Sequence, residues 1–280
     1  MKPAPFAYQR PGGMADTVEL LQQSNGSAKV LAGGQSLGPM LNMRLVQPRL
    51  LVDVTGIPEL KRADVEDDVL VIGACVTHAD IEDRRVPEVT AGLLPRVAEA
   101  VAYRAVRNRG TLGGSLTHAD PAADWISVLC ALGADAMIYG PRGRYRLPVL
   151  DYVTGAFEVA LAEDELLEAV RVPRLQKTAR WGFYKVCRRM GEFADAIGTV
   201  LYDPDRGVCR AVVGAIGSKP LVLADAREEV FRSGGGGFPR LQDFDAAAAE
   251  KWLERSGLHE PIDRRLHLIA LKRAIDEAAS

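Results

Sequence analysis

The stretch RNRGTLGGSLTHADPAAD at residues 107–124 decides the expected fold and site of this chain. Gly113 and Gly114 make a turn in which no Cβ covers the backbone amides, and Arg107 and Arg109 bring positive charge to it. An apolar helix is expected to follow the turn. Such a turn suits a phosphate, because uncovered amides, basic side chains and a helix N-terminus direct positive charge to one point.

A second turn of the same kind lies upstream, in AGGQSLG at residues 32–38. It follows the apolar run at residues 30–31 and precedes an expected helical turn through Met40, Leu41 and Met43. A glycine pair alone is more often a tight connection, but two such turns suggest a ligand with two phosphates. Neither turn has the Lys-Ser/Thr of a P-loop or the GxGxxG of a Rossmann unit, so a different way of holding the ligand is expected.

The composition indicates a globular protein with a large core. The chain has 280 residues, of which 48% are hydrophobic and 26% charged, and its net charge is -2. This balance favours neither a disordered nor a nucleic-acid-coating protein. No apolar segment of a signal peptide is seen in residues 1–14, and no later run approaches the roughly 18 apolar residues of a membrane span. We therefore expect a cytoplasmic protein with no nucleic-acid partner and no membrane span.

The cysteines and histidines give no metal or disulfide pattern. The four cysteines, Cys75, Cys130, Cys187 and Cys209, are dispersed and never form CxxC, so we expect reduced thiols and neither a disulfide framework nor an iron–sulfur ligand set. Cys130 and Cys209 lie in apolar runs and are expected to be buried. The Thr-His-Ala-Asp sequence at 77–80 recurs at 117–120, and a helix cap or a neighbour of the phosphate turn is favoured there over a metal site.

Hydrophobic periodicity and turn residues predict the remaining elements. Strands are expected at residues 28–31, 50–54, 69–72, 134–139, 196–202 and 208–216, the last two joined by a hairpin turn at 203–207. Helices are expected after caps at Asp16 and Thr77, at residues 93–106, from Pro121, and at 221–231, 244–253 and 263–278. Residues 233–237 are expected to form a flexible joint.

These elements divide the chain into three expected units. The first two, residues 1–55 and 56–172, are small α/β units, and the third spans residues 173–280. We place the last boundary in the segment 171–189, which has seven basic residues and no acidic one. A short antiparallel sheet with a helical layer is expected for the third unit.

Three ordered motifs give the chain a family resemblance. AGGQSLGPMLNMRL at 32–45 and VRNRGTLGGSLTHADPAADW at 106–125 resemble the two flavin-binding signatures of the FAD subunit of molybdenum hydroxylases, the group of carbon monoxide dehydrogenase medium subunits and xanthine dehydrogenases. Residues 183–194 are similar to the family's aromatic-Lys, Arg-Arg and Gly-acidic-aromatic-Ala pattern. The resemblance covers nearly the whole chain. It implies an α+β protein whose FAD-binding fold comprises two small α/β subdomains of the vanillyl-alcohol-oxidase/PCMH-like kind, followed by a C-terminal domain.

The resemblance also implies the residues that bind the cofactor. The FAD diphosphate would be wrapped by residues of the two turns, namely Ala32, Gly33, Gly34, Gln35, Ser36 and Leu37, and Thr111, Gly113, Gly114 and Ser115. Asp124 would accept a hydrogen bond from a ribose or ribityl hydroxyl, Leu167 and Lys185 would lie near the flavin ring, and Phe193 would cover one ring face. The residues alone leave open a solvent-facing Asp124, an exposed Lys185 and a core Phe193. No side-chain nucleophile is required, because the flavin supplies the redox chemistry.

The resemblance further implies partner subunits. A large molybdopterin subunit would oxidise the substrate, a small subunit with two [2Fe-2S] clusters would relay electrons, and this chain would pass them to an external acceptor, in a dimer of heterotrimers. Non-covalent FAD is expected, because Gln35 stands where related oxidases attach the flavin through His or Cys. Two alternatives remain: a self-sufficient FAD-dependent oxidase of the vanillyl-alcohol-oxidase-like class, and a non-redox nucleotide-binding assembly module.

Overall fold

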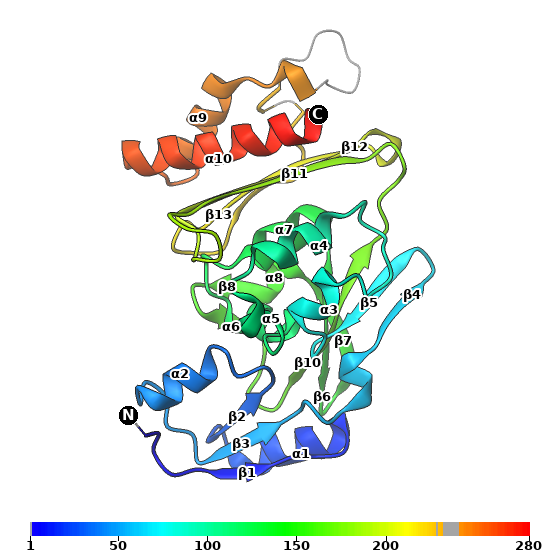
Figure 1. The fold of residues 1–280 in the computed structure, drawn as a ribbon, viewed down its shortest axis with the longest axis vertical. Helices are drawn as coiled ribbons and strands as arrows, with labels where there is room; N and C mark the ends of the chain where they lie inside the picture. The colour runs from blue at the N-terminus through cyan, green and yellow to red at the C-terminus, as the bar shows by residue number, and fades with distance from the viewer. Residues whose placement is uncertain (1, 228, 232–240) are drawn as a thin grey trace.

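The three larger β-sheets follow one another along the longest axis of the molecule (Figure 1). The computed structural model describes residues 2–227, 229–231 and 241–280. The N-terminal sheet lies at one end, a five-stranded sheet with most of the short helices lies in the middle, and a four-stranded sheet with the C-terminal helices lies at the other end. This arrangement confirms the α+β class and the antiparallel sheet with helices at the C-terminal end, whereas the three unit boundaries stay predictions.

The N-terminal sheet is parallel, with strand order β1-β3-β2, and comprises β1 (Ala7–Gln9), β2 (Ala28–Leu31) and β3 (Leu50–Asp53). α1 (Met14–Ser24) buries Met14, Val18 and Leu21, and Met14 and Leu21 belong to the core of this part of the chain. Asp16 was expected to cap α1 but lies in its first turn, because the helix begins earlier, after Gly13. α2 (Leu37–Asn42) follows the first glycine turn.

The middle sheet is antiparallel, with strand order β4-β5-β10-β6-β7. Its strands are β4 (Ala63–Glu66), β5 (Val69–Gly73), β6 (Asp135–Gly140), β7 (Gly143–Pro148) and β10 (Leu166–Pro173). Its helices are α3 (His78–Glu82), α4 (Leu93–Ala100), α5 (Arg104–Arg107), α6 (Leu112–His118), α7 (Asp124–Leu132) and α8 (Val149–Tyr152). A small hairpin, β8 (Val153–Gly155) and β9 (Glu158–Val159), follows α8. Every residue of α7 is buried, so this helix forms the centre of the largest hydrophobic core.

Two expected helices of the middle part differ from the structure. The helix expected at 93–106 is broken into α4 and α5, because Ala102 has a left-handed φ of 43° and Arg107 binds the carbonyls of the intervening residues. The helix expected from Pro121 begins at Asp124. Residues 120–123 form a turn in which the Asp120 side chain accepts from the amide of Ala122.

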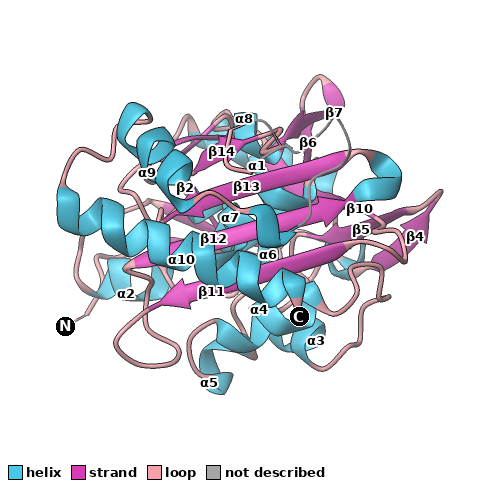
Figure 2. Cartoon of the chain, turned by 90° about the horizontal axis from the view of Figure 1, so that it is seen from above, coloured by secondary structure: helices cyan, strands magenta, loops and turns pink. Residues whose placement is uncertain are grey.

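The C-terminal sheet is antiparallel and lies between two helices. Its strands, in spatial order, are β11 (Arg180–Val186), β12 (Ala196–Asp203), β13 (Val208–Gly214) and β14 (Leu221–Leu223). α10 (Pro261–Ala279) crosses the outer face, as Figure 2 shows, and α7 packs on the other face. Glycines allow this close approach: a Cβ on Gly182 would lie 1.7 Å from the carbonyl oxygen of Ala274 in α10, and one on Gly214 would lie 2.0 Å from Ser127 Oγ in α7.

The predictions for the C-terminal part are mostly confirmed. The hairpin at 203–207 is present, and α9 (Ala246–Arg255) and α10 occupy the two last expected helices. The helix expected at 221–231 is wrong, because Leu221–Leu223 forms β14 and completes the hydrogen bonds of β13. The joint expected at 233–237 lies outside the described residues.

The four cysteines are free thiols in the structure. Cys130 and Cys209 are buried, as predicted, and Cys75 is buried as well. In the ranges that the structure describes, no helix is both long enough and apolar enough to span a lipid bilayer.

Candidate functional site

The two glycine turns contact each other directly, although about eighty residues separate them in the sequence. A Cβ on Gly33 would lie 2.0 Å from the carbonyl oxygen of Arg109 and 2.8 Å from the Cα of Gly110. A Cβ on Gly114 would lie 4.0 Å from the Cβ of Ala32. Figure 1 shows the corresponding arrangement, with α2 below α5 and α6. The turns therefore form one continuous surface, as a ligand with two phosphates would require.

The first turn has free backbone amides. Among the described residues, none accepts a hydrogen bond from the amides of residues 33–37. Gly34 has a left-handed φ of 71°, which glycine adopts without strain. The side-chain amide of Gln35 donates to the carbonyl of Gly33 at 3.1 Å. Five neighbouring amides are thus available to an anion in a half-buried turn.

The second turn differs from the prediction, because Gly113 and Gly114 lie in the first turn of the helix α6, which begins after the N-cap Thr111. Its amides already have protein acceptors. The amides of Leu112 and Gly113 donate to the carbonyls of Val76 and Ala74, each at 3.0 Å, and that of Gly114 donates to Thr111 Oγ1 at 3.0 Å. A Cβ on Gly113 would lie 2.4 Å from that of Ala74, so this glycine permits close packing. The expectation of uncovered amides in the second turn is therefore wrong. Its side chains, including the hydroxyls of Thr111 and Ser115, remain as possible ligand contacts.

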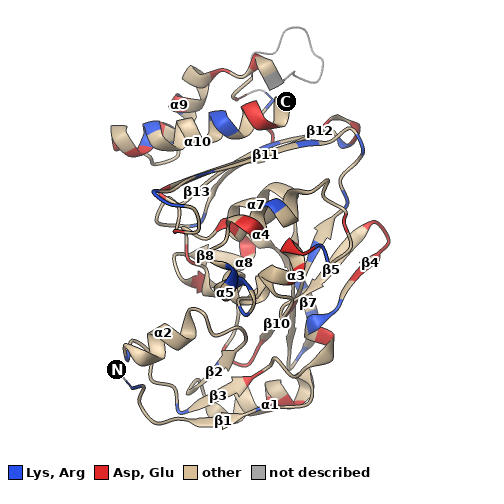
Figure 3. Ribbon diagram, viewed as in Figure 1, with Lys and Arg blue, Asp and Glu red and all other residues tan. Residues whose placement is uncertain are grey.

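The two arginines of the second motif are in different environments. Arg107, on the basic helix α5 (Figure 3), donates from Nε and Nη2 to the Glu82 carboxylate, both at 2.8 Å. Its Nη1 donates to the carbonyls of Val101 and Ala102 at 3.0 and 2.9 Å, and its side chain is 11% exposed. Arg107 therefore does not bring charge to the turn, contrary to expectation. Arg109 is exposed, and its side chain has no hydrogen bond or ion pair within the described ranges.

Asp124 and Lys185 form a buried ion pair. Lys185 Nζ lies 3.0 Å from Asp124 Oδ2 and also donates to the carbonyl of Ala100 at 3.3 Å. The two side chains are 7% and 6% exposed, so the alternatives of an exposed Lys185 and a solvent-facing Asp124 are wrong. Burial raises the pKa of Asp124 to about 6, against the opposing effect of Lys185. Asp124 Oδ1 is buried without a hydrogen-bond partner among the described residues, so it can accept from a ligand hydroxyl.

The third motif places its aromatic residue at the surface. Phe193 is 67% exposed, so the core alternative is wrong, and the nearby Met190 is 81% exposed. Gly191 has a left-handed φ of 87°, and its Cβ would lie 2.7 Å from the carbonyl oxygen of Ala102. The loop that carries Phe193 is therefore held against residues 100–102, which also receive Lys185.

Leu167 belongs to the hydrophobic core. It is 3% exposed, and a register shift between β10 and β6 follows it.

Two contacts of the site were not predicted from the sequence. They are the hydrogen bond of Lys185 to the Ala100 carbonyl and the ion pair of Lys185 with Asp124. The only sequence signal for the ion pair is a lysine in a segment that contains no acidic residue to pair with it.

The repeated Thr-His-Ala-Asp sequences have structural roles. Thr77 and Asp80 form the predicted cap of α3 as a reciprocal capping box. His78 Nδ1 accepts from Trp125 Nε1 at 3.1 Å, and burial together with Arg107 lowers the pKa of His78 to about 4. Within the described ranges no group of three His, Cys, Asp or Glu residues is placed to hold a metal ion.

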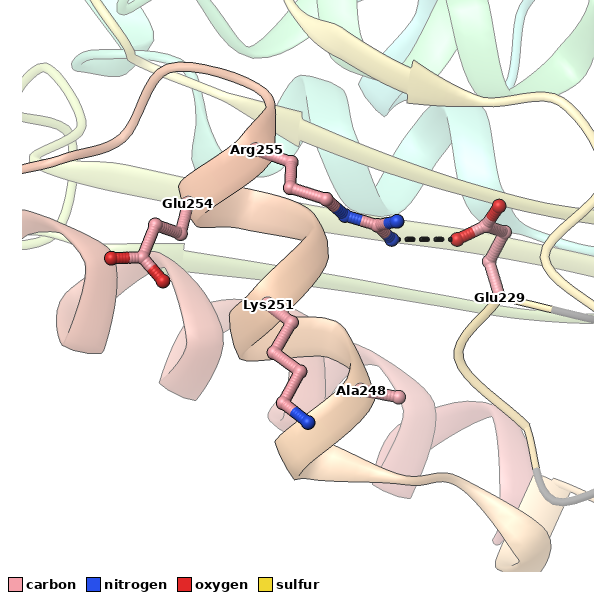
Figure 4. A pocket seen from close by; sticks show the side chains of 5 residues that line it. All are labelled: Glu229, Ala248, Lys251, Glu254 and Arg255. Carbon is pink, nitrogen blue, oxygen red and sulfur yellow. Dashed lines mark hydrogen bonds and ion pairs between the residues drawn. The ribbon is translucent and has the colours of Figure 1, made fainter.

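Two surface hollows lie outside the turns. One, of about 300 Å³, is lined by residues of α9 and by Glu229, which pairs with Arg255 at 3.0 Å (Figure 4). The other, of about 530 Å³, is lined by residues of β1, of α1 and of the segment between them. Neither contains a residue of the three motifs.

Known proteins share this fold over the whole chain. The structure of carbon monoxide dehydrogenase from Hydrogenophaga pseudoflava, which lacks the Mo-pyranopterin moiety of the molybdenum cofactor, matches with a TM-score of 0.87, 29% identity and coverage of 99% of this chain and 98% of that chain. Quinoline 2-oxidoreductase from Pseudomonas putida 86 matches with a TM-score of 0.85 and 31% identity, over 100% and 98% of the two chains. The fold is therefore that of a subunit of such oxidoreductases.

Sequence comparison then gives the family. Residues 4–175 match the family described as the FAD binding domain in molybdopterin dehydrogenase. The nicotine 6-hydroxylase medium subunit of Paenarthrobacter nicotinovorans is 34% identical over 288 aligned residues, 100% of this chain and 99% of the relative. The caffeine dehydrogenase subunit beta of Pseudomonas sp. (strain CBB1) is 35% identical over 225 residues, 79% and 76% of the two chains. The chain belongs to the FAD-binding subunits of molybdopterin dehydrogenases, which confirms the predicted family, cofactor and oxidoreductase class.

Proposed function

We propose that this chain binds one FAD non-covalently and is the electron outlet of a molybdopterin-dependent dehydrogenase or hydroxylase. It would take electrons from the [2Fe-2S] clusters of a small subunit and pass them to an external acceptor. The observation that carries the proposal is the direct contact between the two glycine turns, because it places the free amides of residues 33–37 beside the second motif. The family match supports the choice of FAD as the ligand.

The residues of the two turns would hold the diphosphate unequally. The amides that follow Ala32, those of Gly33, Gly34, Gln35, Ser36 and Leu37, can all donate to phosphate oxygens. From the second turn, the hydroxyls of Thr111 and Ser115 would donate, while Gly113 and Gly114 keep the two segments close. The unpartnered Oδ1 of Asp124 fits a ribose or ribityl hydroxyl, since a buried carboxylate oxygen without a donor is unfavourable.

The remaining site residues would act on the flavin ring. The flavin supplies the redox chemistry when it is bound. Lys185 carries a positive charge in a buried position, where it can stabilise negative charge on a ligand. Phe193 is exposed on a loop fixed by Gly191, so it can cover one ring face and exclude water. Leu167, which is 3% exposed, would contribute to the apolar surroundings of the ring.

We propose a small iron–sulfur subunit and a large molybdopterin subunit as partners, in a dimer of heterotrimers. The names of the relatives, which include a medium subunit and a subunit beta, support a multi-subunit complex. Part of the basic segment at 171–189 is neutralised within the chain, because Arg171 pairs with Glu66 and Arg174 pairs with Asp68. Arg188 and Arg189 have no ion pair with a described residue and adjoin exposed apolar side chains, so this loop is our candidate for the partner-facing surface. The free, dispersed cysteines favour a cytoplasmic complex.

Co-expression tests this proposal. The chain should form a stable complex with an iron–sulfur and a molybdopterin subunit, and substrate should bleach the flavin of the complex but not that of the lone chain. Acid precipitation should release all the flavin. Oxidation of a small organic substrate by the lone chain would favour the self-sufficient oxidase, and a colourless protein with a bound nucleotide would favour the assembly module.

A further inference from the structure

We propose that Arg109 is the cation that neutralises the diphosphate of the bound dinucleotide, and that Arg107 has no part in this contact. The inference rests on the proposed FAD site and assigns a residue to its charge balance. A diphosphate carries full negative charges, whereas backbone amides offer only partial positive ones, so an adjacent cation strengthens the site.

The other arginines of the two glycine motifs are already engaged. Arg107 makes four hydrogen bonds, to Glu82 and to the carbonyls of Val101 and Ala102, and it is nearly buried. Turning it toward a ligand would leave the carboxylate and two carbonyls without donors, which is costly. Arg44, beyond the end of α2, donates from Nε to the carbonyl of Lys2 at 3.2 Å. Arg109 alone among these arginines has a side chain with no partner in the described ranges.

The backbone of Arg109 is fixed beside the first turn, and only its side chain is free to move. The amides of Arg109 and Gly110 donate to the carbonyl of Val106 at 3.1 and 2.7 Å, and the carbonyl of Gly110 accepts from the amide of His78 at 2.9 Å. The Arg109 carbonyl packs against Gly33. A guanidinium on a fixed backbone next to five free amides is suited to a phosphate, because its planar fork can donate two parallel hydrogen bonds to phosphate oxygens.

The test compares FAD affinity of the full-length chain, freed of flavin, at about 0.05 M and about 0.5 M NaCl, since salt screens exposed charges. Arg109→Gln should weaken FAD binding about tenfold to a hundredfold at low salt, as expected for loss of a charge-assisted hydrogen bond, and the deficit should shrink at high salt. Arg109→Lys should recover part of the affinity, because it keeps the charge and loses the fork. Arg146→Gln, which removes an exposed arginine of β7 without a described partner, should change affinity less than about twofold, within the scatter of surface substitutions.

Three outcomes would overturn the assignment. The first is an FAD affinity of Arg109→Gln equal to that of Arg146→Gln. The second is a loss of FAD affinity in Arg109→Gln that has the same size at both salt concentrations. The third is a melting temperature of flavin-free Arg109→Gln below that of the flavin-free wild type. Failure of the wild-type chain to bind FAD would instead reject the proposed function itself, so the two failures are distinguishable.

Discussion

The carbonyl oxygen of Arg109 occupies the space into which a Cβ on Gly33 would project, at a separation of only 2.0 Å. Gly33 has no left-handed φ, so the requirement for glycine comes from contact with the second motif and not from the backbone conformation of its own turn. Each turn thus fixes the position of the other, and the ligand surface depends on both.

Gly33→Ala should separate the turns. We expect the free energy of unfolding to fall by about 1–3 kcal/mol, as for overpacking of a close contact, and FAD binding to weaken strongly. Thermal melting and FAD titration measure both effects. The control is Gly12→Ala, between β1 and α1 and outside the three motifs, where the added Cβ meets nothing within 4 Å beyond its chain neighbours, and it should retain both stability and affinity. Unchanged FAD affinity in Gly33→Ala would show that the ligand does not require contact between the turns.

Gly34→Ala should weaken FAD binding through the conformation of the free amides. Gly34 and Gly207 have similar left-handed φ values, 71° and 67°, so Ala at either position should lower stability by roughly 1–2 kcal/mol. A Cβ at Gly207, in the hairpin turn between β12 and β13, meets open space and lies outside the three motifs. Denaturation should therefore give similar losses for the two variants, and flavin titration should give a loss for Gly34→Ala only. Equal affinities would mean that the first turn is merely a connection.

Asp124→Asn should remove a pH dependence of stability in the flavin-free chain. Burial raises the folded-state pKa of Asp124 from 3.8 to about 6, so folding favours its protonated form. The contribution of Asp124 to stability is therefore complete below pH 3.8 and is lost as the pH rises through about 6. The difference in unfolding free energy between wild type and Asp124→Asn should shift by on the order of a few kcal/mol between pH 4 and pH 7.

Chemical denaturation across this pH range measures the difference, and Asp151→Asn, which removes an exposed carboxylate of α8, is the control. A difference in unfolding free energy between wild type and Asp124→Asn that stays constant across this pH range would contradict the prediction.

Asp124→Asn should also weaken FAD binding about tenfold, since the amide is a poorer acceptor for a ligand hydroxyl than a carboxylate.

Arg107→Gln should destabilise the chain whether or not flavin is present. It breaks a nearly buried ion pair and two hydrogen bonds to carbonyls, which is worth on the order of 2–4 kcal/mol. Arg104→Gln also removes an arginine that binds Glu82, but from a more exposed position, and its effect should be much smaller. Melting temperatures of the flavin-free variants test this. Similar melting temperatures for the two would refute the structural role of Arg107.

Features set by local chemistry were predictable from the sequence. The Thr77 cap and the hairpin at 203–207 depend on side chains within a few residues of each other, and both are present. The free amides of the first turn were also expected, because its glycines carry no Cβ to cover the backbone.

The errors arose where distant contacts decide the structure. The amides of Leu112 and Gly113 bind the carbonyls of Val76 and Ala74, just after β5, and no local pattern shows this. Likewise, the strand Leu221–Leu223 exists because β13 offers it an unpaired edge, and a short apolar run is equally compatible with a helix. Lys185 and Asp124 are 61 residues apart, so their pairing needed the three-dimensional structure.

The close packing of α10 on Gly182 and Gly198 has a consequence for biosynthesis. β11, which carries Lys185, is an edge strand, and α10 is translated only after all four strands of its sheet. On the ribosome, that sheet therefore emerges with one apolar face still uncovered. Side chains alternate along β11, so Gly182 faces α10 and Lys185 lies on the other face, where it pairs with Asp124 of α7. Because α7 is translated before the sheet, the ion pair of the site can form while the opposite face still awaits α10.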